Sequence, residues 1–263
     1  MTPDLFGGIA ALLYLAYLWL QLRSKAFETF SNRRVAAFAL PALLSHLIYA
    51  VFLIQTEAGI QLTAWSSAVL VLWVATALTF YLYLVQGYRV LAFIVVPLSF
   101  IAIGGSLALP MTHNPPIEQT TAIVHVLVSM LAYATLALAA LQAGAIIALH
   151  YRLKKHDATA FIKLMPPLQT VESTSSWLLW LGGALLTISI ATGFIGRWDF
   201  VQEGNYLTHL TLAFAAWFIY VALIAGQLWF GWRGLLSARL SLLAFAVLVL
   251  GYFGLTFIFG YGT

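Results

Sequence analysis

Long apolar stretches separated by short polar connections dominate the pattern of the chain. Eight of them reach or approach the roughly 20 residues that a helix needs to cross the hydrocarbon core of a bilayer. The pattern therefore predicts eight transmembrane helices, at Leu5–Leu22, Val35–Ile54, Ala64–Leu84, Val90–Leu109, Thr120–Leu149, Trp177–Ile195, Leu207–Trp229 and Leu236–Phe259. We expect an all-α, polytopic membrane helical bundle that forms a single transmembrane domain over residues 1–263.

Composition supports this class and excludes several others. Hydrophobic residues make up 63% of the 263 positions and charged residues 8%, with a mean hydropathy of +0.97, far from a soluble domain. The net charge of +4 does not indicate nucleic-acid binding, because the basic residues lie at helix ends and not along one face. The chain has no cysteine, which excludes disulfides, iron–sulfur clusters and thiolate–metal sites. The start of the chain lacks a basic region, so no cleavable signal sequence is expected.

The distribution of Lys and Arg predicts the orientation of the helices. Of the 12 basic residues, only Arg197 falls in a connection on one side of the predicted bundle. The other side holds Arg23, Lys25, Arg33, Arg34, Arg89, Arg152, Lys154, Lys155, Lys163, Arg233 and Arg239. Because cytoplasmic loops carry the excess of Lys and Arg, we expect both termini in the periplasm. The longest connection, residues 150–176, is then a cytoplasmic loop.

Three histidines fall inside predicted spans. His46 lies about 17 Å along its helix from the cytoplasmic end, and His125 lies about 8 Å below the periplasmic boundary, by the helical rise. His209 lies just inside the periplasmic end of the seventh span. Ionisable side chains are costly in a membrane and mark functional sites there. We therefore treat all three as candidate ligands that open toward one periplasmic-side cavity.

Haem is the cofactor that these residues fit. Its iron takes axial histidine nitrogens from facing helices, and its macrocycle is buried among apolar side chains. His125 and His209 have similar depth on separate helices and are the predicted metal ligands, with His46 as a reserve ligand or gate. Arg197, the lone cation on its side, is a candidate partner of a haem propionate. The simpler interpretation is that each histidine only hydrogen-bonds a neighbouring helix and that Arg197 only extends to the interface.

Five stretches in the second half of the chain, covering roughly residues 120–256, follow one another in an order and spacing typical of a known family. They are His125–Tyr133, Leu164–Glu172, Leu185–Gly193, His209–Trp217 followed by Gly231–Gly234, and Tyr252–Gly254. On these stretches the chain resembles the cytochrome c assembly family, which includes the System II synthetase membrane subunit and the HemX-type proteins. It is similar to a short eight-helix branch of that family in the inner membrane of Gram-negative bacteria.

The chain also departs from the haem-delivering members of that family. Those members carry a long tryptophan-rich external segment between the sixth and seventh helices, where this chain has only Trp198 and Asp199. They place a histidine near the cytoplasmic end of the seventh helix, where Gln227 stands, and another beyond the last helix. The resemblance therefore implies a protein that binds and transfers haem b, and not an enzyme that attaches haem to a cytochrome.

Two other functions remain open from the sequence. HemX-type relatives imply a membrane regulator without a cofactor, whose cytoplasmic loop at residues 150–176 docks a protein partner; the simpler alternative is that this basic loop contacts anionic lipid. A quinone- or ion-handling enzyme is less favoured, because it would need buried acids or paired arginines, and every Asp and Glu lies outside the predicted spans.

Overall fold

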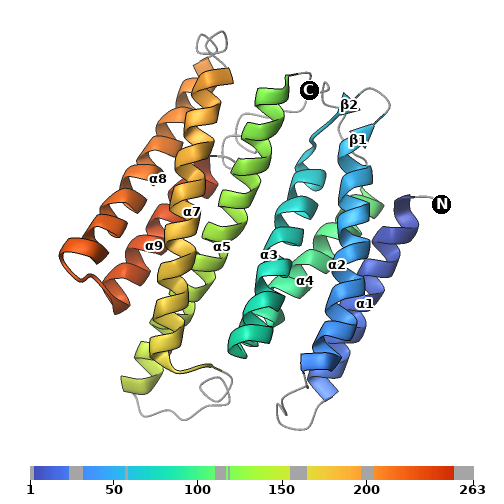
Figure 1. The fold of residues 1–263 in the computed structure, drawn as a ribbon, viewed down its shortest axis with the longest axis horizontal. Coiled ribbons are helices and arrows are strands. Elements are labelled where there is room, and N and C mark those ends of the chain that lie inside the picture. The colour runs from blue at the N-terminus through green and yellow to red at the C-terminus, as the bar shows by residue number, and fades with distance from the viewer. Residues whose placement is uncertain are drawn as a thin grey trace. The chain divides into compact units, whose positions relative to one another are not determined.

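The computed structural model is a set of long helices joined by short connections (Figure 1). It describes residues 3–23, 32–56, 59–109, 117, 119–154, 165–196 and 204–251. The elements are α1 (Pro3–Arg23), α2 (Asn32–Ile54), β1 (Gln55–Thr56), β2 (Gly59–Ile60), α3 (Ala64–Gln86), α4 (Val90–Ala108), α5 (Thr120–Lys154), α7 (Leu168–Gly196), α8 (Gly204–Trp229) and α9 (Gly234–Val249).

The helix lengths confirm a polytopic membrane helical bundle. Seven of the helices in the described ranges are long and apolar enough to cross a membrane. The eighth, α9, is apolar but is described for only 16 residues, because most of the predicted span beyond Val249 lies outside the described residues. The short β1–β2 hairpin, in which Gln55 pairs with Ile60, was not expected from the sequence.

The chain divides into two compact units. The N-terminal unit comprises residues 1–118 with 160–166, and the C-terminal unit comprises residues 119–159 with 167–263. In the N-terminal unit, α1 packs against α2 and α4, and α3 packs against α2 and α4. The hairpin joins α2 to α3, and the backbone of Ile117 donates to the carbonyl of Ile60 across a distance of 2.8 Å.

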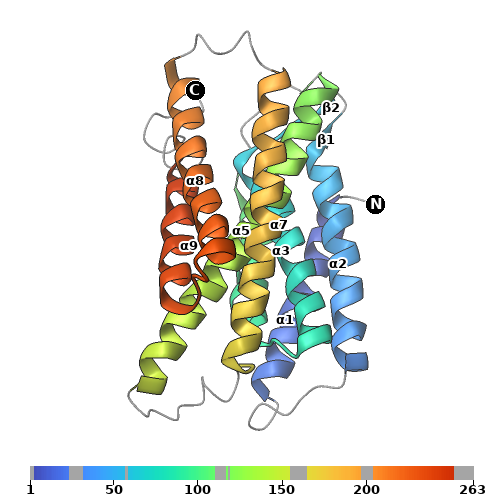
Figure 2. The same ribbon diagram turned by 60° about the vertical axis from the view of Figure 1, so that its left-hand side comes forward.

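The C-terminal unit is built around the long helix α5. This helix packs against α7 and α9, and α8 packs against α7 and α9, so that the four helices enclose one core (Figure 2). The core is filled by Ala132, Leu136, Leu179, Leu186, Ala216, Tyr220, Leu223, Ala244 and Leu248. All nine are buried, and burying such side chains is the main favourable contribution of packing.

The connection between α5 and α7 is shorter than the sequence suggested. Helix α5 continues to Lys154, and α7 begins at Leu168 instead of Trp177. Pro167 directly precedes the first turn, and its carbonyl accepts hydrogen bonds from the backbone of Thr170 and Val171 at 2.8 and 3.2 Å. Proline at a helix start costs no intrahelical hydrogen bond. Glu172 consequently lies on a helix and not in a loop, which corrects the expectation that no acidic residue of this region belongs to a span.

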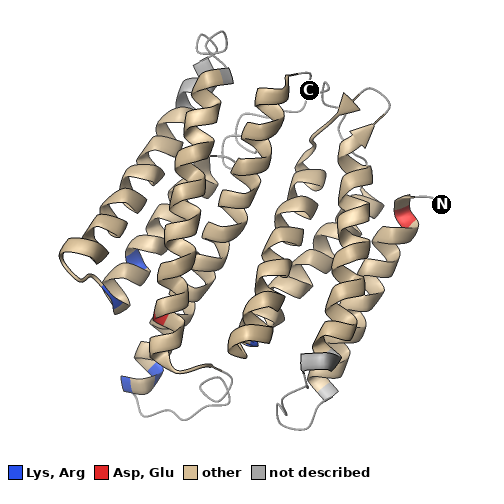
Figure 3. Ribbon diagram, viewed as in Figure 1, with Lys and Arg blue, Asp and Glu red and all other residues tan. Residues whose placement is uncertain are grey.

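Basic side chains gather at one end of the C-terminal unit. This end is formed by the last turn of α5, the first turns of α7 and the connection from α8 to α9 (Figure 3). Arg152 and Lys154 lie in the last turn of α5, and Arg233 and Arg239 lie at the start of α9. Within this unit, these four basic residues therefore lie at the helix ends that the sequence analysis assigns to the cytoplasmic loops.

Candidate functional site

His125 lies in the second turn of α5 and faces α7. Its Nδ1 is 2.8 Å from the backbone carbonyl oxygen of Ser189 and 3.3 Å from Oγ1 of Thr192. A carbonyl oxygen can only accept, so in the neutral ring Nδ1 carries the proton and donates it. The lone pair of the imidazole is then on Nε2, which is the tautomer that a metal-binding histidine uses when a carbonyl fixes its other nitrogen.

Small and hydroxylated residues make the space for this imidazole. A Cβ at Gly193 would lie 2.9 Å from Cε1 of His125, so only glycine leaves room for the ring in this position. Ser129, one turn after His125, bonds the Ser189 hydroxyl at 2.6 Å and donates to the His125 carbonyl at the same distance. These contacts fasten α5 to α7 at the level of the histidine.

The residues that hold His125 were not singled out from the sequence. Ser129 is spaced one helical turn from His125, which places the two on one face of the helix. Ser189, Thr192 and Gly193 all lie in the stretch 185–193 that resembles the family pattern, so a signal was present. The family pattern alone, however, does not indicate that this stretch packs against His125.

His46 has a different environment, in the N-terminal unit. Its side chain is fully buried, and its Nε2 is 3.1 Å from the carbonyl oxygen of Val69, to which it donates. Its Nδ1 accepts from the hydroxyl of Tyr14 at 2.9 Å. Both ring nitrogens are therefore engaged by the protein, which is the simple structural interpretation of a membrane histidine. Its role as a reserve ligand or gate stays a prediction.

The two other predicted site residues are described incompletely or not at all. His209 is the sixth residue of α8, but its side chain is outside the described residues. Arg197 lies in the connection between α7 and α8 and is also outside them. By helix bounds alone, His125 and His209 occupy equivalent positions, each the sixth residue of a helix.

Gln227, which stands where haem-delivering relatives are expected to place a histidine, is part of a hydrogen-bonded group of its own. Its Oε1 accepts from Nε1 of Trp180 at 3.2 Å, and its Nε2 donates to the hydroxyl of Ser237 at 2.8 Å. This links α7, α8 and α9 at the end of the unit opposite to His125.

The model of a family described as cytochrome C assembly protein matches residues 62–260, about three quarters of the chain. The chain belongs to the cytochrome c assembly family. The match confirms the resemblance seen in residues 120–256 and extends it back to the start of α3.

Relatives of this cytochrome c assembly family protein include the inner membrane protein YpjD of Escherichia coli strain K12. The two are 33% identical over 132 residues, 50% of this chain and 49% of that protein. An uncharacterized 28.8 kDa protein of Azospirillum brasilense, from the nifR3-like 5' region, is 31% identical over 138 residues, 51% of this chain and 50% of that protein. The chain thus spans about half the length of these relatives in the aligned part. No solved structure matches it.

The relatives and the helices together give the localisation. YpjD is an inner membrane protein, and the described part of this chain holds seven helices that can span a membrane. This member of the cytochrome c assembly family is a multi-pass protein of the bacterial inner membrane.

Proposed function

We propose that this protein binds haem b reversibly and passes it on, with His125 and His209 as the axial ligands. The observation that carries the proposal is the hydrogen bond from Nδ1 of His125 to the Ser189 carbonyl, 2.8 Å long. It fixes the ring and its tautomer with the proton on Nδ1, as in histidines that bind a metal through Nε2. Membership of the cytochrome c assembly family makes haem the metal complex that this nitrogen would take.

The chemistry of the chain's own residues fits this cargo. A neutral imidazole binds haem iron without adding charge to the membrane interior, where an uncompensated charge is costly. The apolar and aromatic side chains near the same end, including Phe194 and Phe214 with ring centroids 5.7 Å apart, suit a macrocycle that must be shielded from water. Bound haem would supply an iron centre, and the protein would hold and release it without forming a covalent bond.

The remaining candidates take supporting roles in the proposal. Arg197 follows α7 directly, at the end of the helix that carries Gly193, and there it would pair with a propionate. For His46 to act as a reserve ligand, it would have to release Tyr14 or the Val69 carbonyl. Both termini and the haem site would face the periplasm, as the basic residues predict.

An absorption spectrum of the detergent-purified protein, with and without added haemin, tests the proposal. We expect a Soret band that is lost in His125→Ala and in His209→Ala. His150→Ala is the matched control, because His150 is an exposed histidine near the far end of the same helix α5. Wild-type protein that takes up no haemin would contradict the proposal and favour the alternative of a regulator without a cofactor.

A further inference from the structure

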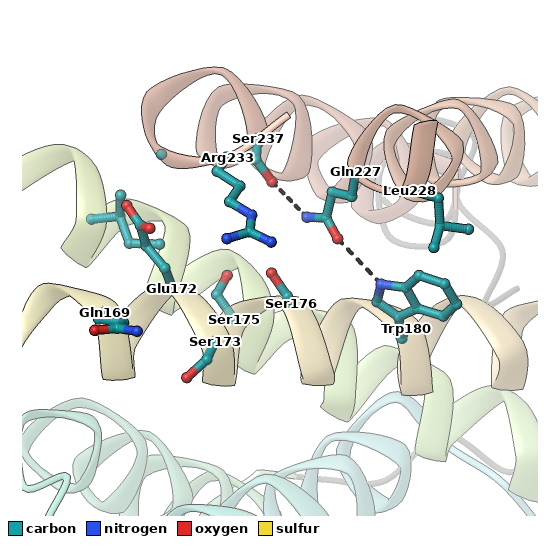
Figure 4. Close-up of a pocket in the computed structure, with 12 residues that line it drawn as sticks. Gln169, Glu172, Ser173, Ser175, Ser176, Trp180, Gln227, Leu228, Arg233 and Ser237 are labelled. Atoms are coloured by element: carbon teal, nitrogen blue, oxygen red, sulfur yellow. Dashed lines mark hydrogen bonds between the residues drawn. The ribbon is translucent and has the colours of Figure 1, made fainter. Parts of the chain in front are cut away.

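A cavity lined by both polar and apolar side chains lies in the C-terminal unit, at the end where the basic residues gather (Figure 4). Its volume is about 410 Å³, within the range of sites for small organic ligands. Residues from α5, α7, α8 and α9 line it, so the cavity is formed by the packing of the whole unit. It lies at the opposite end of the helices from His125 and is therefore separate from the proposed haem site.

One wall of the cavity is held rigid by internal hydrogen bonds. The Gln227 amide lies between Trp180 and Ser237 and bonds both of them, as the dashed lines in Figure 4 show. Because the indole can only donate, the amide oxygen must face Trp180 and the NH₂ group must face Ser237. This wall presents a fixed surface and needs no ligand to satisfy its polar atoms.

The facing groups have no such partners. Glu172 and Arg233 both line the cavity, yet within the described part of the chain neither forms a hydrogen bond or an ion pair, and they do not pair with each other. The hydroxyls of Ser175 and Ser176 point toward the Arg233 guanidinium in the same view, and among the described residues they too have no hydrogen-bond partner. A carboxylate and a guanidinium thus share one cavity with space between them.

These groups define the chemistry of a ligand. A guanidinium flanked by two hydroxyls suits an anion with several oxygens, such as a phosphate. A nearby carboxylate suits a cation. A primary ammonium fits this carboxylate better than a quaternary ammonium does, because it can donate hydrogen bonds to Glu172. Quaternary ammonium groups are recognised by aromatic cages instead. We propose that the cavity binds a phosphoethanolamine group, with its phosphate at Arg233, Ser175 and Ser176 and its ammonium at Glu172.

The surroundings point to a phospholipid headgroup as the source of this group. The cavity is at the end of membrane-spanning helices, where lipid headgroups lie. Leu228 lines the cavity and is exposed, and the two residues that follow it, Trp229 and Phe230, are 78% and 73% exposed. An exposed apolar patch beside a cavity that holds a carboxylate and a guanidinium suits a ligand with a charged head and hydrocarbon chains. A free phosphoethanolamine compound carries the same head without the chains, and the test distinguishes the two.

Native mass spectrometry of the purified protein, titrated with lipids of identical acyl chains, measures the binding. We expect phosphatidylethanolamine to bind more tightly than phosphatidylcholine by about tenfold, the equivalent of one hydrogen-bonded ion pair at about 1.4 kcal/mol. Glu172→Gln should abolish this preference while phosphate binding remains. Arg233→Gln should weaken the binding of both lipids by about tenfold or more.

The control is Arg239→Gln, which removes a guanidinium at the same end of the unit. Arg239 bonds the Tyr151 hydroxyl at 3.0 Å and does not line the cavity, so this variant should bind lipid as the wild type does. Glycerophosphoethanolamine is added as a competitor without acyl chains; competition equal to that of the lipid would identify a soluble ligand as the source and overturn the lipid assignment. Equal binding of the two lipids to wild-type protein, or a preference that survives both cavity variants, would overturn the site itself.

Discussion

At the residue scale, two imidazoles on membrane-spanning helices differ in burial and in hydrogen bonding: His46 is fully buried and His125 is partly buried. In His46 one nitrogen donates to the Val69 carbonyl and the other accepts from Tyr14, so the ring joins α1, α2 and α3. In His125 the contacts to Ser189 and Thr192 are both made by Nδ1. In each ring the protonated nitrogen donates to a backbone carbonyl, which fixes the tautomer, and in His46 the Tyr14 hydroxyl engages the other nitrogen.

A substitution beside His125 should separate haem binding from folding. Gly193→Ala would place a methyl group 2.9 Å from the imidazole and displace the ring from the Ser189 carbonyl. We expect haem uptake to fall by about tenfold, as for the loss of an orienting contact of a metal ligand, measured by haemin titration. Gly144→Ala, on α5 with no atom near the added Cβ, is the control and should leave uptake unchanged. Equal uptake by both variants would argue against His125 as a ligand.

Two threonines on α3 offer a second comparison. Both are fully buried, but Thr76 bonds the Ser99 hydroxyl and the Leu72 carbonyl, each at 2.7 Å, whereas the hydroxyl of Thr79 has no partner among the described residues. Thr79→Val should raise the free energy of unfolding by about 1 kcal/mol, because it removes a buried unsatisfied hydroxyl. Thr76→Val should lower it by about 1 kcal/mol, because the hydrogen bond between Thr76 and Ser99 is lost while Ser99 keeps its bond to the Val95 carbonyl at 3.0 Å. Thermal denaturation in detergent measures both; the same sign for the two changes would contradict this argument.

At the element scale, close helix contacts depend on single glycines. Gly105 on α4 lies against the Trp65 ring on α3, and a Cβ there would be 2.3 Å from two ring atoms, while the neighbouring Gly104 has open space. The missing side chain at Gly105 lets α3 and α4 approach closely, as small residues do between helices of membrane bundles. The neighbouring positions therefore make a matched pair.

Gly105→Ala should destabilise the protein by about 1–3 kcal/mol, because the large indole cannot move without disturbing the packing around it. Gly104→Ala should be neutral or should stabilise by a few tenths of a kcal/mol up to about 1, since alanine is the better helix former. Thermal denaturation of the two variants provides the measurement. A destabilisation of similar size at both positions would show that helix propensity, and not the Trp65 contact, sets the effect.

At the scale of the whole molecule, the charge distribution predicts the orientation in the membrane. Helix α5 has 35 residues, about 50 Å at 1.5 Å per residue, and therefore extends beyond a hydrocarbon core of about 30 Å. The extension carries Arg152 and Lys154, and it lies at the end where Arg233 and Arg239 also are. The two ends of this helix should be on opposite sides of the membrane.

Single cysteines test this orientation without any background, because the chain has none of its own. A membrane-impermeant maleimide should label Gln119→Cys in intact spheroplasts and should label Lys154→Cys only after permeabilisation, as the excess of basic residues on one side predicts. Both positions are exposed and flank the same helix. The reverse pattern would place the basic loops and the cavity at Glu172 in the periplasm.

The sequence by itself determined the class of the protein, its family and most helix bounds. These follow from local quantities: the length and composition of each apolar stretch decide whether it spans a bilayer, and Pro167 is followed directly by the start of α7. Even so, the apolar-length criterion places that start nine residues too late, at Trp177 instead of Leu168, because the first turns of α7 are polar.

Only the tertiary structure decided which side chains meet. Neither the partners of His46 and His125 nor the cavity that brings Glu172 and Arg233 together without pairing them can be read from spacing. Their positions depend on how each helix is rotated and shifted against its neighbours, which is set by packing along the full length of several helices at once. The length of each apolar stretch sets the length of its helix. Because the hydrophobicity is nearly uniform around the helix, the sequence does not show which side faces a neighbour, and the packing contacts between helices decide this.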